Sequence, residues 1–348
     1  MPQNLIPATI LTGFLGSGKT TLLKRVLSEA HGQKIAVIEN EFGEENIDND
    51  ILAVDTEEQI IQMSNGCVCC TIREDLRSTL AELAAKKRKG ELAFDRVVIE
   101  TTGLADPGPV AQTFFMDDEI AETYLLDSIL TLVDAKHAEA QLDTRQEARR
   151  QVGFADQIFI SKADLVAQDE VDALVHRLKH MNPRAPQRTV HFGAVPLDQV
   201  FDLQGFNLNA KLDVDPAFLD DAGHAHDGHD HAPGAQCDHP SHPARHHAHD
   251  DDVKSLVFRS ERAFVPAKLE DFLGAIVQVY GPKMLRYKGV LYMKGSERKV
   301  VFQGVHQLMG SDLGPKWAPG EKKGSKLVFI GIELPRDVLL QGLEQCLV

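Results

Sequence analysis

Short apolar runs alternate with longer polar stretches over roughly the first two hundred residues. Two longer stretches, 19–30 and 71–87, predict helices between the runs. Buried strands that alternate with helices form parallel sheets covered on both faces, so the pattern predicts an α/β domain over residues 1–205. The apolar runs that predict its strands are 5–12, 34–39, 59–63, 95–100, 128–134, 157–161 and 189–192.

This alternation of apolar runs and polar stretches stops at residue 206. From His224 to His249, nine histidines are mixed with aspartate, proline, alanine and glycine, and Cys237 lies among them. So polar a composition buries too little apolar surface to fold by itself, which predicts a flexible linker over 206–252. Neutral imidazoles on such a chain offer many weak, exchangeable metal sites, so metal capture is favoured over an accidental low-complexity loop.

Strand-like and helical patterns return after the linker. The strand-like segments are 253–260, 284–293, 298–306 and 326–334, and the helical ones are 266–279 and 334–346. We therefore expect a smaller α+β domain over residues 253–348.

The charge and the cysteine content narrow the class of protein. The 348 residues carry 37 basic and 52 acidic side chains, a net charge of −15, which disfavours nucleic acid and anionic membranes as partners. The chain has no run of about 18 apolar residues, as a membrane span needs, and its N-terminus lacks the features of a signal peptide. We expect a cytoplasmic protein whose five cysteines serve metal or redox chemistry rather than structural disulfides.

The segment GFLGSGKT stands between the first predicted strand and the first predicted helix. It matches the phosphate-binding pattern G-x-x-x-x-G-K-[ST] in the strand–turn–helix setting that the pattern requires. Backbone amides and the helix N-terminus would surround a phosphate, Lys19 would supply positive charge, and Thr20 would offer its hydroxyl to Mg²⁺. The residues predicted to hold the nucleotide are Gly13, Gly16, Ser17, Gly18, Lys19, Thr20 and Thr21. The α/β domain is thus predicted to have the fold of a P-loop nucleotide hydrolase.

Two further polar motifs follow predicted strands. Glu100 ends the run 95–100, where a carboxylate could reach Mg²⁺ through a water or orient the attacking water; the alternative is a solvated strand end. Lys162 and Asp164 follow the run 157–161. The carboxylate could accept hydrogen bonds from guanine N1 and N2 while the lysine lies along the base, which would select GTP over ATP. A merely polar strand end is again the alternative.

Three thiols occur within four residues, at Cys67, Cys69 and Cys70. Thiolates bind Zn²⁺ and similar ions, but three so close together do not easily bind one ion in relaxed tetrahedral geometry. We expect one or two of them to bind together with side chains from elsewhere. Glu39 and Glu44 are candidates, because they follow a predicted strand near the P-loop and parallel strands end at one edge of a sheet. Burial as small apolar side chains is the alternative for the cysteines, and their polar neighbours disfavour it.

Together these motifs resemble the CobW/YjiA family of metal-handling GTPases, relatives of the nickel-insertion GTPases of urease and hydrogenase. The resemblance covers the chain except for the histidine-rich stretch. It implies a Ras-like GTPase domain, a CobW C-terminal domain, and slow Mg²⁺-dependent hydrolysis of GTP to GDP. It also implies zinc that is bound at the cysteine motif and passed to a client metalloprotein. The segments that carry it are GFLGSGKT, IENEFGE, NGCVCC, IETTGLADPGPV and SKAD, then LRYKG, VFQGVH and VFIGIEL.

The resemblance assigns roles to individual residues of this chain. It gives phosphate and Mg²⁺ binding to residues 16–20, guanine recognition to Lys162 and Asp164, and metal binding to Glu39, Glu44, Cys67, Cys69 and Cys70. With the strand-end position of Glu100, the predicted catalytic residues are Lys19, Thr20 and Glu100. Ser161 departs from the usual guanine motif, which has asparagine there. A serine is not expected to copy the bridging amide of asparagine, so base selectivity is expected to be weaker.

Three functions compete at this point. A GTPase metallochaperone is favoured over a GTP- or ATP-dependent accessory enzyme for cobalt insertion into a corrin. The third candidate is a metal-storage protein with a regulatory P-loop. Cysteine, glutamate and histidine serve several ions, so the sequence leaves Zn²⁺, Co²⁺ and Ni²⁺ open.

Overall fold

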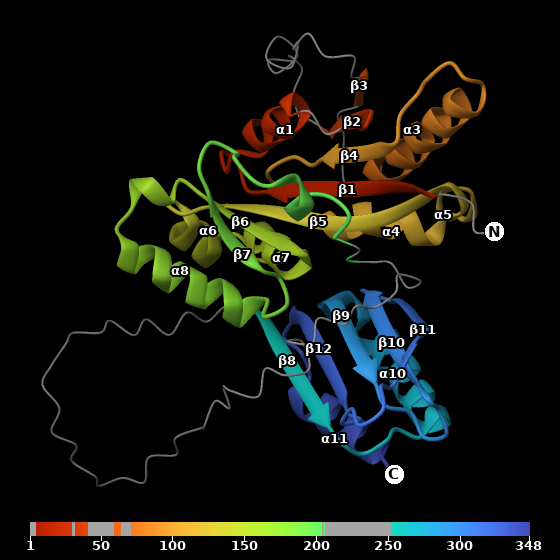
Figure 1. Ribbon diagram of the computed structural model, residues 1–348. Coiled ribbons are helices and arrows are strands. Elements are labelled where there is room, and N and C mark those ends of the chain that lie inside the picture. Colours follow the sequence, from red (N-terminus) through yellow and green to blue (C-terminus); the bar gives the residue numbers. More distant parts are fainter. Residues whose placement is uncertain (1–4, 30–31, 41–58, 64–70, 204, 206–251) are drawn as a thin grey trace, which may run out of the picture.

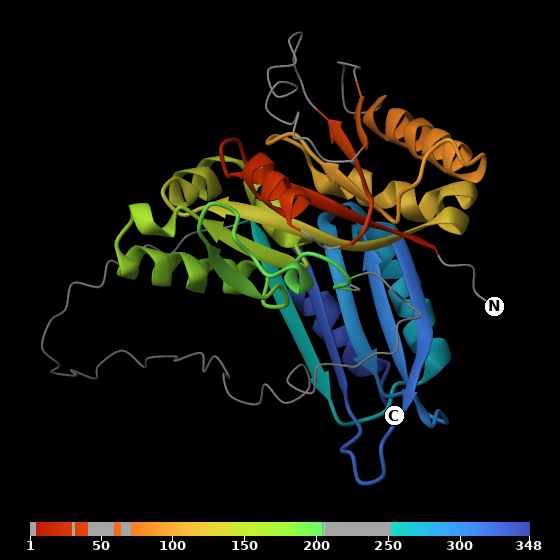
Figure 2. The ribbon, with the colours of Figure 1, turned by 45° about the horizontal axis from the view of Figure 1, so that its top comes forward.

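The computed structural model describes residues 5–29, 32–40, 59–63, 71–203, 205 and 252–348. Within these ranges the strands form a seven-stranded sheet and a five-stranded sheet. The five-stranded sheet lies beneath the larger one in Figures 1 and 2. The histidine-rich stretch, the cysteine motif and Glu44 lie outside the described residues.

The larger sheet is parallel throughout, in the order β3-β2-β4-β1-β5-β6-β7. After β1 the chain builds one side of the sheet, returns beside β1 with β4, and then builds the other side. Such a reversal beside β1 is where open α/β sheets bind ligands. The strands are β1 (Ile6–Gly13), β2 (Ile35–Asn40), β3 (Gln59–Met63), β4 (Arg96–Glu100), β5 (Tyr124–Asp134), β6 (Gln157–Ser161) and β7 (Gln187–Val190).

Helices connect these strands, as the alternating pattern predicts. Asp106 starts one of them by accepting a hydrogen bond from the Gly108 amide at 2.9 Å, and Pro107 occupies the first helical position, where its missing N–H costs nothing. The helices are α1 (Lys19–Ser28), α3 (Thr71–Arg88), α4 (Pro107–Met116), α5 (Asp118–Thr123), α6 (Ala138–Thr144), α7 (Gln146–Phe154) and α8 (Gln168–Met181), with the short turns η1 (Ala163–Leu165) and η2 (Leu197–Gln199).

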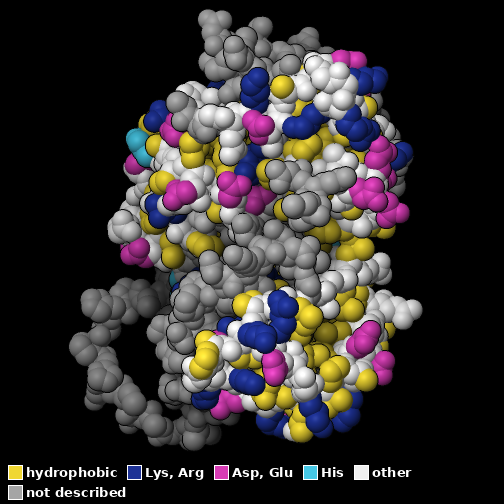
Figure 3. All heavy atoms as spheres, turned by 45° about the vertical axis from the view of Figure 1, so that its right-hand side comes forward, with side chains coloured by type: hydrophobic (Ala, Val, Ile, Leu, Met, Phe, Trp, Pro, Cys, Tyr) yellow, Lys and Arg dark blue, Asp and Glu magenta, His cyan; other side chains and the backbone are white. Residues whose placement is uncertain are grey.

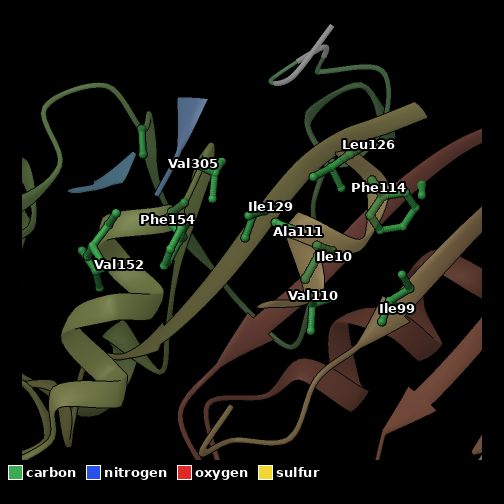
Figure 4. Packing of buried hydrophobic residues seen from close by; sticks show 14 of the residues in the cluster. Ile10, Ile99, Val110, Ala111, Phe114, Leu126, Ile129, Val152, Phe154 and Val305 are labelled. Carbon is green, nitrogen blue, oxygen red and sulfur yellow. The ribbon is translucent and has the colours of Figure 1, made fainter. Parts of the chain in front are cut away.

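Alternate residues of the central strand supply the two cores of this layered domain. Leu11 packs in a cluster with apolar residues of α1 and with the segment 195–201. Ile10 packs in a second cluster with α3, α4 and α7. Figure 4 shows Ile10 and Ile99 of the sheet facing Val110 and Phe114 of α4. The side-chain period of two thus covers both faces of the sheet with helical layers.

The C-terminal part is an antiparallel sheet in the order β11-β10-β9-β12-β8, with two long helices. Its own core joins the sheet to both helices, for example through Leu273, Phe329 and Leu339. The elements are β8 (Val253–Ser260), α10 (Pro266–Tyr280), η3 (Gly281–Lys283), β9 (Met284–Leu291), β10 (Arg298–Val305), β11 (Leu308–Lys316), β12 (Ser325–Ile332) and α11 (Arg336–Gln345).

The two parts share a packed interface. Phe154 of α7 and Val305 of β10 belong to one apolar cluster, which Figure 4 shows from close by. Arg286 of β9, 2% exposed, donates to the Phe154 carbonyl oxygen at 2.8 Å and to the Gly205 carbonyl oxygen at 3.0 Å. It also forms an ion pair with Asp156. Apolar packing and buried polar contacts therefore both join the C-terminal sheet to the larger domain.

Several expectations about elements need correction. The segment 308–316 forms the edge strand β11, which the sequence analysis did not predict, because its glycines, proline and polar residues have low strand propensity. The run 128–134 is part of a longer strand that begins at Tyr124. None of the described helices combines the length and the apolar composition that a membrane crossing requires. The domain boundaries at 205 and 252 stay predictions.

Candidate functional site

Five neighbouring strands of the larger sheet end in glycine or in a polar residue. They are Gly13 of β1, Asn40 of β2, Glu100 of β4, Asp134 of β5 and Ser161 of β6. Because the strands are parallel, these ends lie along one edge of the sheet. Figure 1 shows α1 following β1 directly at this edge.

The turn between β1 and α1 needs glycine at three positions. Gly13, Gly16 and Gly18 have φ angles of 145°, 73° and 97°, which other residues rarely adopt. A Cβ on Gly13 would stand 2.4 Å from the Leu132 carbonyl oxygen of β5. The turn therefore keeps its backbone close to the sheet, where its amides can face a phosphate.

Lys19 and Ser17 lie within this turn with their polar atoms inward. The Lys19 ammonium donates to the carbonyl oxygens of Gly13 at 2.9 Å and Phe14 at 3.3 Å, and the residue is 9% exposed. The buried Ser17 hydroxyl has no hydrogen-bond partner among the described residues. A cradle with a buried cation, a buried hydroxyl and the N-terminus of α1 suits the outer phosphates of a nucleotide.

The adjacent strand brings a carboxylate to the same turn. The Thr20 hydroxyl donates to Glu100 Oε1 at 3.0 Å, although the two residues are 80 positions apart in sequence. A hydroxyl and a carboxylate oxygen side by side are the donor set that Mg²⁺ takes beside nucleotide phosphates, so these residues fit that ion. Gly103, three residues after Glu100, approaches the P-loop so closely that a Cβ there would lie 2.5 Å from the Leu15 amide nitrogen.

The predicted guanine motif also contacts the P-loop. The Ser161 hydroxyl donates to the Ser17 carbonyl oxygen at 2.7 Å, and the Lys162 ammonium donates to the Gly16 carbonyl oxygen at 2.8 Å. Ser161 thus forms one contact with the P-loop, while the weaker base selectivity expected from the missing asparagine amide stays a prediction. The hydroxyl is short, but β6 ends near enough to the turn for it to reach a backbone oxygen.

Asp134 is a site residue that the sequence analysis missed. Its carboxylate, 1% exposed, accepts a hydrogen bond from the Lys162 ammonium at 2.7 Å and lies 2.8 Å from His137 Nδ1. Burial alone would raise the pKa of Asp134, but the hydrogen bonds from Lys162 and His137 outweigh it and hold that pKa below its ordinary value. An acidic residue that ends an apolar strand, as Glu100 does, was the available signal.

The remaining predicted nucleotide residues lie at the rim. Asp164 is half-exposed, and its carboxylate stands 3.5 Å from Nδ1 of His191, in the loop after β7. Gly193 of the same loop approaches α1, with the Thr21 carbonyl oxygen 3.0 Å from a Cβ at that position. Phe192 between them is 79% exposed and has a φ of 46°, strained for a non-glycine residue. The sequence analysis did not select this loop; its signal was a glycine shortly after a strand.

We expect Asp134→Asn to weaken GDP binding by about tenfold, because hydrogen bonds to charged groups contribute about 1.5–3 kcal/mol and Lys162 loses its anchor. Fluorescent-GDP titration measures this. The carboxylate of Asp134 stabilises the site fully at pH values above its ordinary pKa. This contribution is lost as the pH falls through the lowered pKa. Glu139→Gln on the neighbouring helix α6 serves as the control. Equal affinity of Asp134→Asn and wild type would show that Asp134 does not position Lys162.

Of the predicted metal ligands, the structure describes Glu39. It is 6% exposed and lies opposite Glu100 of β4 on one side and Gln62 of β3 on the other. Glu44, Cys67, Cys69 and Cys70 lie outside the described residues. Over the described ranges, no group of three or more histidine, cysteine, aspartate or glutamate side chains forms a metal site.

The face drawn in Figure 3 is not dominated by side chains of one charge. On the face shown in Figure 3, acidic side chains lie among basic ones on both halves of the molecule. The net charge of −15 is thus not gathered into one patch on that face.

Comparison with known proteins agrees with this geometry. Residues 7–189 match the CobW/HypB/UreG nucleotide-binding domain, and residues 253–347 match the cobalamin synthesis protein cobW C-terminal domain. The chain is 38% identical to the zinc chaperone YjiA of Escherichia coli over 96% of each chain. It is 31% identical to the zinc-regulated GTPase metalloprotein activator 1 of Dictyostelium discoideum, over 88% of this chain and 66% of that protein. The crystal structure of Zn(II)-bound YjiA GTPase from E. coli superposes with a TM-score of 0.76 at 34% identity and covers 99% of both chains. This chain therefore belongs to the CobW/HypB/UreG family and carries its P-loop nucleotide-binding domain together with a CobW C-terminal domain.

Proposed function

We propose that this protein hydrolyses GTP and couples the hydrolysis to the delivery of zinc to a client metalloprotein. The observation that carries the proposal is the contact between Thr20 and Glu100, because Glu100 is also the strand neighbour of Glu39. A residue suited to a phosphate-bound ion and a candidate zinc ligand thus occupy adjacent strands. Zinc and GTP are proposed because the relatives are named as a zinc chaperone, a zinc-regulated GTPase and a Zn(II)-bound GTPase.

The chain's own groups have separable roles in hydrolysis. Lys19 would leave the carbonyl oxygens of the turn and neutralise charge on the outer phosphates. Thr20 and Glu100 would hold Mg²⁺, which neutralises charge on the phosphate oxygens when bound. Asp164 would accept hydrogen bonds from guanine while Lys162, held by Asp134, lies along the base.

The short chain between β3 and the cysteine motif allows a zinc site at this edge. β3 ends at Met63, which pairs with Asn40 at the end of β2. Cys67 follows four residues later, so an extended chain covers at most about 14 Å. Glu100 of β4 stands two strands from β3, which corresponds to roughly 10 Å. Covalent geometry therefore permits a zinc site made from the cysteine motif and Glu39, with Glu44 as a further ligand.

Coupling between the two sites has a thermodynamic consequence. If GTP changes the affinity for zinc, zinc must change the affinity for GTP by the same factor. Thiolate ligands release protons on binding, so zinc affinity should fall as the pH is lowered. In the proposed switch, a γ-phosphate orders the segments after Glu39 and Cys67 and hydrolysis releases them; both segments extend outside the described residues.

We expect wild-type protein to turn over GTP slowly, with a rate that changes when Zn²⁺ is added. Cys69→Ala should keep the basal rate and lose the response to zinc, because a soft ligand is gone while the phosphate cradle is intact. Phosphate release with and without Zn²⁺ measures both. Cys346→Ala is the matched control, since this buried thiol near the C-terminus donates to the Lys268 carbonyl oxygen, outside the candidate site.

The other outcomes separate the competing functions. Loss of all turnover in Cys69→Ala would give the cysteines a structural role, and equal zinc affinity with and without a GTP analogue would contradict coupling. A preference for ATP together with stimulation by Co²⁺ would favour the cobalt-insertion enzyme. Deletion of 224–249 tests storage, because a storage protein should lose almost all of its bound metal with that stretch.

A further inference from the structure

We propose that α7 connects the C-terminal domain to the loop that follows Glu100, and that Gln151 is a positioning residue for GTP hydrolysis. The inference rests on the proposed GTPase function and extends it, because it identifies the path by which the C-terminal domain reaches the nucleotide site. The contacts that support it lie on two sides of α7, a helix of nine residues.

One side of α7 holds the loop between β4 and α4. Gln151 is 1% exposed, and its side-chain amide donates to the carbonyl oxygens of Gly103 at 3.2 Å and Ala105 at 3.0 Å. The backbone carbonyl oxygen of Gln151 accepts a hydrogen bond from the Thr131 hydroxyl of β5 at 2.9 Å. Gln151 is therefore fixed to the sheet and uses both amide hydrogens to hold the loop.

The preceding residue of α7 holds the end of the same loop. Arg150 forms an ion pair with Asp106, whose other carboxylate oxygen caps α4 through the Gly108 amide. At its start the loop lies against the P-loop, because Gly103 leaves no room for a Cβ beside Leu15. Any shift of α7 must consequently move the loop relative to the phosphate cradle or break these hydrogen bonds.

The other side of α7 belongs to the interface with the C-terminal sheet. A Cβ on Gly153 would stand 2.8 Å from Leu285 of β9 and 3.2 Å from Val253 of β8, so the strands pack directly on the helix backbone. Arg149 pairs with Asp252, the residue before β8. The helix is thus held on the sheet by close packing and by an ion pair.

One residue of the C-terminal domain touches both α7 and α4. The His306 ring packs edge-on against Phe154, with centroids 5.3 Å apart, and its Nε2 would lie 2.7 Å from a Cβ on Gly108. Burial holds the pKa of His306 below its ordinary value, which favours the neutral ring, although Asp106 acts to raise that pKa. His306 therefore packs between α7 and α4, the two helices that hold the loop between β4 and α4.

These contacts form an unbroken series from the C-terminal sheet, through Phe154 and Gln151, to Gly103 beside the P-loop. In well-packed interiors, small displacements of one element are transmitted to its neighbours. A partner that shifts the C-terminal sheet would thereby change the position of the loop and the rate of hydrolysis. Ground-state nucleotide binding would change little, since the P-loop itself keeps its contacts.

GTP turnover of the full chain tests this series. We expect Gln151→Met, which keeps the side-chain length and removes the amide, to lower kcat about tenfold, or about 1.4 kcal/mol in the barrier. The KM for GTP and the affinity for GDP should stay within about twofold, a split that loss of packing alone would not produce. Glu147→Gln, on the same helix, is the control and should match wild type.

A variant in the other domain keeps the inference testable if Gln151→Met folds poorly. His306→Phe retains a ring against Phe154 and should change kcat about threefold, again at constant GDP affinity. The two changes combined should be non-additive in log kcat, because they act on one loop through one helix.

Unchanged kcat in both variants, or strict additivity, would overturn the inference and leave the proposed function standing. A wild-type protein without GTP turnover would overturn the proposed function and this inference with it.

Discussion

Replacing Lys19 by methionine is expected to lower the rate of GTP hydrolysis by on the order of 10²–10³, the usual effect of removing one preorganised charge from a transition state. Lys19 is the cation buried in the turn after β1, and its ammonium already lies among backbone carbonyl oxygens that a phosphate can replace as partners. Methionine keeps the unbranched stem and removes the charge. The effect should therefore fall on chemistry and on GTP binding more than on folding.

Single-turnover hydrolysis measures the effect on chemistry, and binding of a fluorescent, slowly hydrolysed GTP analogue measures the effect on GTP binding. Lys24→Met is a suitable control, because Lys24 lies on the same helix five residues further along and outside the cradle. A Lys19→Met protein that hydrolyses GTP at the wild-type rate would show that this cradle is not where the γ-phosphate reacts.

Replacing Arg286 by methionine is expected to lower the free energy of unfolding by about 3–5 kcal/mol, the usual loss when one partner of a buried ion pair is removed. The guanidinium is 2% exposed and satisfies the carbonyl oxygens of Phe154 and Gly205 as well as the Asp156 carboxylate, itself 5% exposed on its side chain. Without Arg286, Asp156 loses this buried partner and two carbonyl oxygens lose a donor at the interface between the two sheets.

Urea denaturation followed by circular dichroism measures the loss. Because the interface joins two cores, we expect the variant to unfold in two transitions if the C-terminal part unfolds first. Fluorescence of Trp317 reports on that part. Arg262→Met is the control, since Arg262 is exposed and its ion pair with Glu344 should contribute at most about 1 kcal/mol. A loss below 1 kcal/mol for Arg286→Met would indicate that apolar packing alone holds the interface.

Local patterns sufficed for much of the site. The P-loop could be predicted because its glycines, lysine and threonine are close together in sequence, so their spacing alone identifies the turn. The positive φ angles of its glycines confirm that the turn needs glycine there. Glu100 could be predicted to lie near it because both follow parallel strands, which end at the same edge of a sheet. The guanine selectivity, the zinc ligands and the domain boundaries stay predictions.

The place of Asp134 at a strand end was a usable signal, but its contact with Lys162 could not be predicted from the sequence. The same holds for the contacts of Gln151 with Gly103 and of His306 with Phe154. The partners in each pair are far apart in sequence, so each contact depends on which helix or strand packs beside which. Ser161 shows the same limit, because its bridge to Ser17 depends on how near β6 ends to the P-loop.

By itself, the sequence determined the alternation of strands and helices, the parallel sheet, the phosphate-binding turn and the family to which the chain belongs. The tertiary structure decided which strand ends lie side by side and which carboxylate holds Lys162. It also decided how α7 lies between the loop that follows β4 and the C-terminal sheet. The physical reason is range: backbone conformation and hydrophobic period are properties of adjacent residues, whereas hydrogen bonds and burial between distant residues exist only after the layers have packed.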